Sequence, residues 1–144
     1  METIRNLYRI GRGPSASHTI GPVNAAQRFI SQNQEATAFR VQLYGSLAAT
    51  GRGHRTDAAL EKTFGTRKLS IEWHPEIIQP RHTNAMRFEA FDSSGNLTAD
   101  WMAYSIGGGA IVDDSGQNET GDIYPHETMN DILAHCHRKG LTLW

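Results

Sequence analysis

The spacing of apolar residues along the chain predicts alternating helices and strands. Apolar side chains recur at helical spacing from Val23 to Ile30, directly after Pro22, which suits a first helical turn. Residues 38–45 alternate apolar and polar side chains, as a half-buried strand does. The same alternation returns in residues 68–73, 85–91 and 97–106, with a Ser-Ser-Gly-Asn hairpin turn at 93–96.

Two further helices complete the pattern. One is expected to run to Phe64 from an N-cap at Thr56 or Asp57, and the other from His126 to Lys139, where Gly140 ends it. The order is therefore helix, strand, helix, three strands and a helix. This order predicts an α+β fold, in which helices pack on one face of a mixed or mainly antiparallel sheet.

Composition narrows the class of protein. The chain has 144 residues, the size of one ordinary domain, and its net charge is −1. The lysines and arginines are scattered and form no basic stripe for nucleic acid, and the apolar runs are too short to span a bilayer. Glu2 and Arg5 interrupt the apolar core that a signal peptide needs, so we expect a cytoplasmic protein. Its one cysteine, Cys136, fits a reducing compartment.

Two glycine-rich stretches contain most of the candidate chemistry. They read GPSASHTIGP (residues 13–22) and YGSLAATGRGHRTDAAL (residues 44–60), and each places small residues, hydroxyls and one histidine before a predicted helix. A backbone without bulky side chains can approach a ligand, and a helix start offers unpaired N–H groups to an anion. With His18 and His54 in matching places, the two stretches predict one site for a small carboxylate or phosphate.

Each stretch also has a simpler interpretation. Ser15, Ser17 and Thr19 can donate to a carboxylate, yet one hydroxyl after a Gly-Pro turn also suits a helix cap. In the second stretch Thr56 and Asp57 follow a glycine turn and can either meet a ligand or start the helix. The second stretch contains neither a phosphate-binding P-loop nor a dinucleotide fingerprint.

Two later stretches add polar groups. His82 and Asn84, at the entry of a strand, can hold a polar ligand or be ordinary loop residues. The sequence SIGGG at 105–109 removes side chains at Gly107 and Gly108, which allows a close approach or provides a flexible connector. We interpret the remaining candidates near the end of the chain as structural, because neighbours on a helix point in different directions: His126, His135, Cys136 and His137.

Taken in this order, the four stretches resemble the beta domain of iron–sulfur-dependent L-serine dehydratase (L-serine ammonia-lyase). The resemblance runs from Leu7 to Trp144 and departs at Ala16, where that family usually has serine. It implies that residues 1–144 form the beta domain, and that KGLTLW at 139–144 is the junction to a larger alpha domain. The chain is also similar to the allosteric substrate-binding domain of some D-3-phosphoglycerate dehydrogenases.

The resemblance implies a lyase that converts L-serine to pyruvate and ammonia. Its 4Fe-4S cluster would be held by three cysteines of an alpha domain or subunit that is not in this sequence, and the enzyme is expected to be a homo-oligomer. The base that removes the α-hydrogen would be His54, with His82 and then His18 as the next choices. The substrate would be held by Ser15, Ser17, Thr19, Thr56, Asp57, Asn84, Gly107 and Gly108.

Two other hypotheses remain open at this stage. The chain could be a stand-alone regulatory module that binds serine or another small anion without catalysis. Alternatively, the glycine motifs could serve only turns and contacts between copies, which requires four polar-glycine clusters to coincide without a shared purpose.

Overall fold

The structure is a computed structural model that describes residues 11, 14–115, 126 and 128–142. The chain divides into two compact units, which we describe separately. One spans residues 9–119 and contains the sheet, and the other contains the C-terminal helix.

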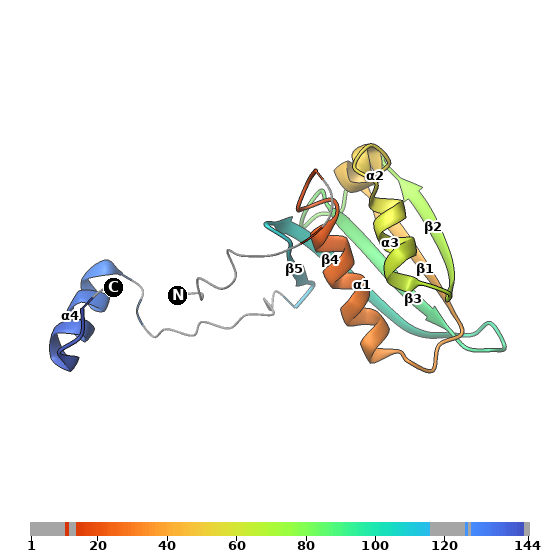
Figure 1. Cartoon of the computed structure of the whole chain (residues 1–144). Coiled ribbons are helices and arrows are strands. Elements are labelled where there is room, and N and C mark those ends of the chain that lie inside the picture. The colour runs from red at the N-terminus through yellow and green to blue at the C-terminus, as the bar shows by residue number, and fades with distance from the viewer. Residues whose placement is uncertain (1–10, 12–13, 116–125, 127, 143–144) are drawn as a thin grey trace. The chain divides into compact units, whose positions relative to one another are not determined.

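The larger unit is a five-stranded mixed sheet with helices on one face (Figure 1). The strand order is β2-β1-β3-β4-β5, where β1 and β2 are parallel and the other neighbours are antiparallel. This arrangement confirms the α+β fold predicted from the sequence. Its elements are α1 (Ile20–Gln32), β1 (Ala38–Tyr44), α2 (Gly45–Gly51), α3 (Thr56–Phe64), β2 (Lys68–His74), β3 (Ala85–Phe91), β4 (Leu97–Gly107) and β5 (Ala110–Asp113).

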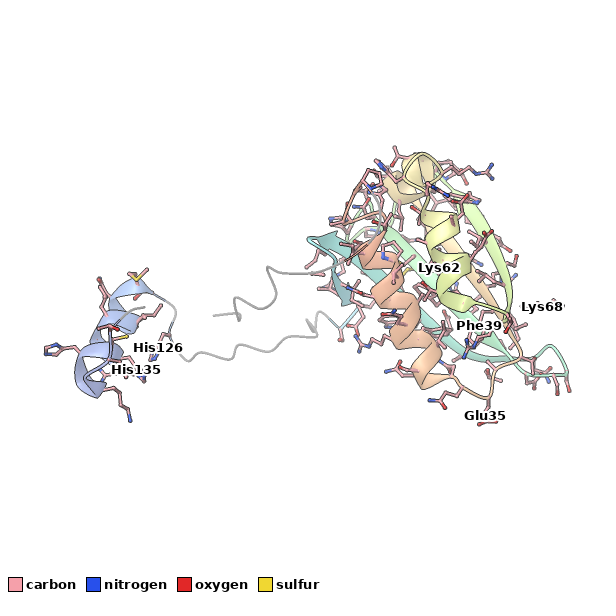
Figure 2. All side chains as sticks on the ribbon, viewed as in Figure 1. Glu35, Phe39, Lys62, Lys68, His126 and His135 are labelled. Atoms are coloured by element: carbon pink, nitrogen blue, oxygen red, sulfur yellow. The ribbon has the colours of Figure 1, made fainter. Side chains whose placement is uncertain are left out.

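The core lies between the helices and one face of the sheet. Alternate residues of β1 are buried there, as period-two patterning requires. Phe39 of β1 lies beside α3, with its ring 5.1 Å from the ring of Phe64 (Figure 2). From α1, Phe29 packs 5.6 Å from Phe88 of β3, so α1 and α3 are fixed to neighbouring parts of the same core.

The opposite face of the sheet carries a ladder of alternating charges. Arg40 of β1 lies 3.5 Å from Glu72 of β2 and also pairs with Glu89 of β3. On β3, Arg87 donates from Nε to Asp100 Oδ1 of β4 at 2.8 Å. These pairs join four strands across a polar face, which is how an antiparallel sheet covered on one side is usually patterned.

Two elements were not predicted from the sequence. Residues 45–51, expected to be a turn, form α2, because Leu47 and Ala48 are buried against the sheet. The three glycines at 107–109 are followed by β5, which pairs with β4. All three adopt positive φ angles (114°, 57° and 81°), so they make a tight reversal between two strands rather than a flexible connector.

The predicted cap of α3 is wrong. The N-cap residue is Arg55, in the left-handed conformation with φ 62°, and no side chain caps the helix. Thr56 is completely buried, and its hydroxyl donates elsewhere, as described below. Asp57 accepts a hydrogen bond from the N–H of Ala58 at 2.8 Å, inside the first turn.

The second unit contains α4 (Met129–Lys139), which begins three residues after the predicted start. A capping box between Thr128 and Asp131 fixes that start, and Gly140 ends the helix in the left-handed conformation, as predicted. The ring of His126 lies 4.6 Å from that of His135 (Figure 2). Across the described parts of the chain, no helix combines the length and apolar character needed to cross a membrane.

Candidate functional site

The first glycine-rich stretch forms a tight turn before α1. Thr19 is the N-cap residue of that helix, but its hydroxyl donates to the carbonyl of Ser15 at 2.6 Å instead of accepting from a helix N–H. The interpretation of these hydroxyls as a simple helix cap is therefore wrong for Thr19. The turn instead directs the side chain of His18 into the protein, where the residue is only 8% exposed.

Hydroxyl groups surround the imidazole of His18. Ser17 Oγ and Ser15 Oγ lie 3.0 and 3.2 Å from Nδ1, and the two oxygens lie 3.3 Å apart. On the other side of the ring, Nε2 lies 2.9 Å from Thr50 Oγ1 and 3.4 Å from the carbonyl oxygen of Ser46. Both nitrogens of His18 are thus within hydrogen-bond distance of neighbours.

His54 is the second histidine of the site. Its ring centroid lies 4.7 Å from that of His18, at an angle of 49°. The residue is half-buried, and its backbone N–H donates to the carbonyls of Thr50 and Gly51. Since α2 positions Thr50 and the turn after it positions His54, one short segment provides two neighbours of the His18 ring.

A second contact joins the first two stretches beneath the rings. Thr56 at the start of α3 donates its hydroxyl to the backbone carbonyl of His18 at 2.6 Å. A Cβ at Gly51 would lie 3.1 Å from this hydroxyl and 2.8 Å from the ring of Trp73. The absence of a side chain at Gly51 therefore allows the end of α2 to pack against Trp73 of β2 and Thr56 at the start of α3.

The third stretch, which precedes β3, packs against the start of α2. Gly45 has φ 50°, and a Cβ there would lie 2.5 Å from the carbonyl oxygen of Thr83. The N–H of Ser46 donates to that carbonyl and to the Thr83 hydroxyl, both at 3.1 Å. Asn84 follows directly and is buried.

The fourth stretch contacts both the third stretch and α1. The N–H of Ser105 donates to the carbonyl of Asn84 at 2.9 Å, and Asn24 of α1 donates to the carbonyl of Gly109 at 2.9 Å. Ser105 Oγ lies so close to α1 that a Cβ at Gly21 would be 2.1 Å from it. Ser105 Oγ and Asn84 Oδ1 are both buried without a hydrogen-bond partner among the described residues.

The four stretches that the sequence singled out therefore meet in the fold, although their histidines do not all meet. His18 and His54 lie together. The Nδ1 of His82 accepts from the N–H of Asn84 at 3.0 Å, and within residues 14–115 no ring contact joins it to the other two histidines. Gly107 ends β4 and Gly108 begins the turn to β5, next to Gly109, whose carbonyl accepts from Asn24.

The surroundings of His18 favour its neutral form. Burial lowers the pKa of the imidazole below its usual value of 6.5, and the positive charge that His54 can carry lowers it further. The carbonyl of Ser46 acts in the opposite direction, because it accepts from a ring N–H. The neighbours of the ring are hydroxyls, one carbonyl and another imidazole, none of which carries a negative charge, so burial outweighs the carbonyl and the neutral form is favoured.

The sequence alone did not indicate Ser46 and Thr50, which both contact His18. The signal was available in the spacing, since these two residues are one helical turn apart and Thr50 precedes His54 by the same interval. It was missed because residues 45–51 were expected to be a turn. The described residues contain no group of three histidine, cysteine, aspartate or glutamate side chains placed to hold an ion.

Comparison with known proteins identifies the family. Residues 3–65 and 60–116 match the model of the serine dehydratase beta chain. The chain belongs to this family. All four stretches of the site fall within the matched residues, whereas α4 lies beyond them.

Curated relatives give the same result over more of the chain. L-serine dehydratase of Haemophilus influenzae is 32% identical over 189 residues, which cover 99% of this chain and 42% of that protein. The Mycobacterium bovis enzyme is 31% identical over 98% of this chain and 40% of its own length. L-serine dehydratase 2 of Escherichia coli is 30% identical over 99% and 41%. The chain thus spans about two fifths of the length of these relatives.

The beta-chain region of this protein is shorter than that of its relatives. The alignment to the Haemophilus protein covers 189 positions, against the 144 residues of this chain. The two family matches meet at residues 60–65, where α3 ends and a short turn leads to β2. The relatives therefore carry additional residues within the aligned region.

Proposed function

We propose that this chain is the beta-chain part of an L-serine dehydratase, which converts L-serine to pyruvate and ammonia. The family match carries the proposal, and the site agrees with it. Two imidazoles and several hydroxyls gather where the first two family-matched stretches meet, and the other two stretches pack against these two. This chemistry suits an amino acid, whose carboxylate needs donors and whose α-hydrogen needs a base.

In this proposal His54 is the base that removes the α-hydrogen. Both nitrogens of His18 are engaged by hydroxyl neighbours, and Nδ1 of His82 is engaged by the N–H of Asn84. The His54 ring has no hydrogen-bond partner among the described residues and is half-buried, so a substrate can approach it. His82 is the next choice because its Nε2 remains available, and His18 is the last.

Hydroxyl groups of the first stretch are proposed to hold the carboxylate. Ser15 and Ser17 are half-buried beside His18, and whichever hydroxyl of this pair does not donate to Nδ1 can donate to a ligand. The hydroxyls of Thr19 and Thr56 are buried and donate to backbone carbonyls, so we assign them a structural role. Asn84 is retained for the substrate amine, because its buried Oδ1 lacks a donor.

Two glycines and one acidic side chain are proposed to complete the site. Gly107 and Gly108 leave the β4–β5 turn without side chains, and Asp57 at the start of α3 can accept from an ammonium group. L-serine would lose the α-hydrogen and the hydroxyl as water, and the resulting enamine would hydrolyse to pyruvate and ammonia.

The iron–sulfur cluster implied by the sequence resemblance does not fit this chain. A 4Fe-4S cluster takes about four ligands, most often thiolates. The sequence has one cysteine, Cys136, which lies on α4 in the other unit. We therefore propose that any cluster is held by an alpha domain or subunit. We also propose that the enzyme is a cytoplasmic homo-oligomer active in amino-acid metabolism.

Pyruvate formation tests the function directly. The chain is assembled with its alpha partner, anaerobically with iron and sulfide, and pyruvate is measured from L-serine. We expect the assembled wild-type complex to turn over L-serine. We expect His54→Ala to reduce kcat by about 10²-fold or more, as loss of acid–base catalysis does. The matched control is His74→Ala, since His74 lies on the charged face of the sheet beside Tyr44 and should tolerate replacement.

The possible results test the dehydratase function and the role of His54 separately. An assembled wild-type complex that makes no pyruvate would refute the dehydratase function. Near-normal turnover in His54→Ala would keep the function and remove His54 as the base, in which case His82→Ala is the next variant.

A regulatory module that binds serine or another small anion without catalysis is the second candidate, because the hydroxyls beside His18 can hold a carboxylate whether or not a proton is transferred. Calorimetry of the chain alone with L-serine distinguishes the two. Tight binding without any partner favours the regulatory module, whereas binding that needs the alpha partner favours a half-site of the enzyme.

A further inference from the structure

The hydroxyl of Thr50 faces two partners but has one proton. It donates that proton to the carbonyl of Ser46, one turn earlier in α2, at 2.9 Å. This is the ordinary arrangement of a threonine inside a helix. Thr50 Oγ1 therefore has only lone pairs to offer to Nε2 of His18, which lies 2.9 Å away.

A second acceptor faces the same nitrogen. The carbonyl oxygen of Ser46 lies 3.4 Å from Nε2 of His18. If Nε2 had no proton, its lone pair would face the lone pairs of two oxygens, which is repulsive. A proton on Nε2 turns both contacts into favourable ones, because a carbonyl and a hydroxyl oxygen can each accept.

The protonation state of Nε2 also determines that of Nδ1 of His18. A neutral imidazole carries one N–H, so Nδ1 of His18 is an acceptor when Nε2 is protonated. Ser17 and Ser15 lie 3.0 and 3.2 Å from Nδ1 and can each donate a hydroxyl proton to it. One directional chain results, from a serine hydroxyl through His18 and Thr50 to the carbonyl of Ser46.

We propose that Thr50 is a positioning residue that holds His18 in the Nε2–H tautomer. The consequence for catalysis rests on the proposed function. With one serine proton given to Nδ1, one hydroxyl of the Ser15–Ser17 pair is free to donate to a carboxylate, and His18 has no open nitrogen. Thr50 thereby sets the number of donors in the site and leaves proton transfer to His54.

Nitrogen NMR of the histidine rings in the full chain tests this without substrate or activity. The chain is labelled in histidine and measured above about pH 7.5, where an imidazole is neutral. His18→Gln identifies the His18 signals by their loss. We expect Nε2 of His18 to give the signal of a protonated ring nitrogen and Nδ1 that of a bare one.

Variants of Thr50 then test whether this residue determines the tautomer of His18. Thr50→Val keeps the shape and removes the acceptor, and should shift the tautomer equilibrium toward Nδ1–H by roughly five- to tenfold, the effect of one hydrogen bond. Thr50→Ser should restore the original tautomer. The matched control is Thr63→Val in α3, because Thr63 makes the same contact to a carbonyl one turn earlier, at 2.8 Å, and does not touch His18.

Each result decides the proposal. A wild-type spectrum with the proton on Nδ1 overturns it, and so does a Thr50→Val spectrum in which the tautomer is unchanged. If Thr50→Val does not fold, Thr50→Ala provides the same comparison at an exposed helix position. Because no turnover is measured, failure here is distinct from failure of the dehydratase function.

Discussion

Gly21→Ala is expected to destabilise the protein even though alanine favours helices over glycine. Gly21 lies in the first turn of α1, where the new Cβ would be 2.1 Å from Ser105 Oγ and 2.9 Å from Ser105 Cβ. Ser105 is completely buried on β4, so it cannot swing into solvent. Overpacking of this kind costs about 1–3 kcal/mol, and the helix preference of alanine offsets up to about 1 kcal/mol. We expect a net loss of about 1–2 kcal/mol.

Urea unfolding followed by circular dichroism measures this loss. With an m-value of about 2 kcal/mol/M, the midpoint should fall by roughly 0.5–1 M. Ser105→Gly clears the space, so the double variant should lose about 1 kcal/mol less than the two single variants together. Gly53→Ala serves as the control, since Gly53 is exposed and its new Cβ would approach one neighbouring atom, the carbonyl oxygen of Thr50, at 3.3 Å. A Gly21→Ala protein as stable as the wild type would show that the fourth stretch does not pack on α1 as described.

Two further predictions concern the contacts beneath the histidines. Thr56→Val removes the buried donor to the carbonyl of His18 and should lower the free energy of unfolding by about 1–3 kcal/mol, a loss that urea unfolding would detect. A loss no larger than that of Thr63→Val would contradict this. His18 has a lowered pKa in the folded protein, so the unfolded chain binds the proton more readily. Stability should therefore fall as the pH drops below about 6.5, through the folded-state pKa. His18→Gln should flatten this part of the profile of urea midpoint against pH, and an unchanged slope would exclude His18.

The sequence predicted most of the larger elements because their patterns are local. Alternation in residues 38–45 and 85–91 was enough to place β1 and β3, and the hairpin at 93–96 connected the last predicted pair. Elements held mainly by tertiary contacts were missed. The helix α2 has a glycine at each end and depends on the burial of Leu47 and Ala48, and β5 has only four residues.

For the candidate site too, local patterns predicted some residues and tertiary contacts revealed the others. Clusters of glycine, hydroxyl and histidine identified His18 and His54 without any coordinates, because such composition is unusual before a helix. The partners Ser46 and Thr50 lacked that signature, since one contributes its backbone carbonyl and the other resembles an ordinary helix residue.

The amino-acid sequence by itself determined the α+β class, the four polar-glycine stretches and the resemblance to the serine dehydratases. Only the tertiary structure decided that these stretches pack against one another, that His18 and His54 share a ring contact which His82 does not join among the described residues, and that Thr56 supports the backbone of His18. The physical reason is that local patterns report which face of an element is buried. The meeting of residues separated by tens of positions depends on strand order and on backbone approaches that glycine permits, such as that of Gly21 to Ser105.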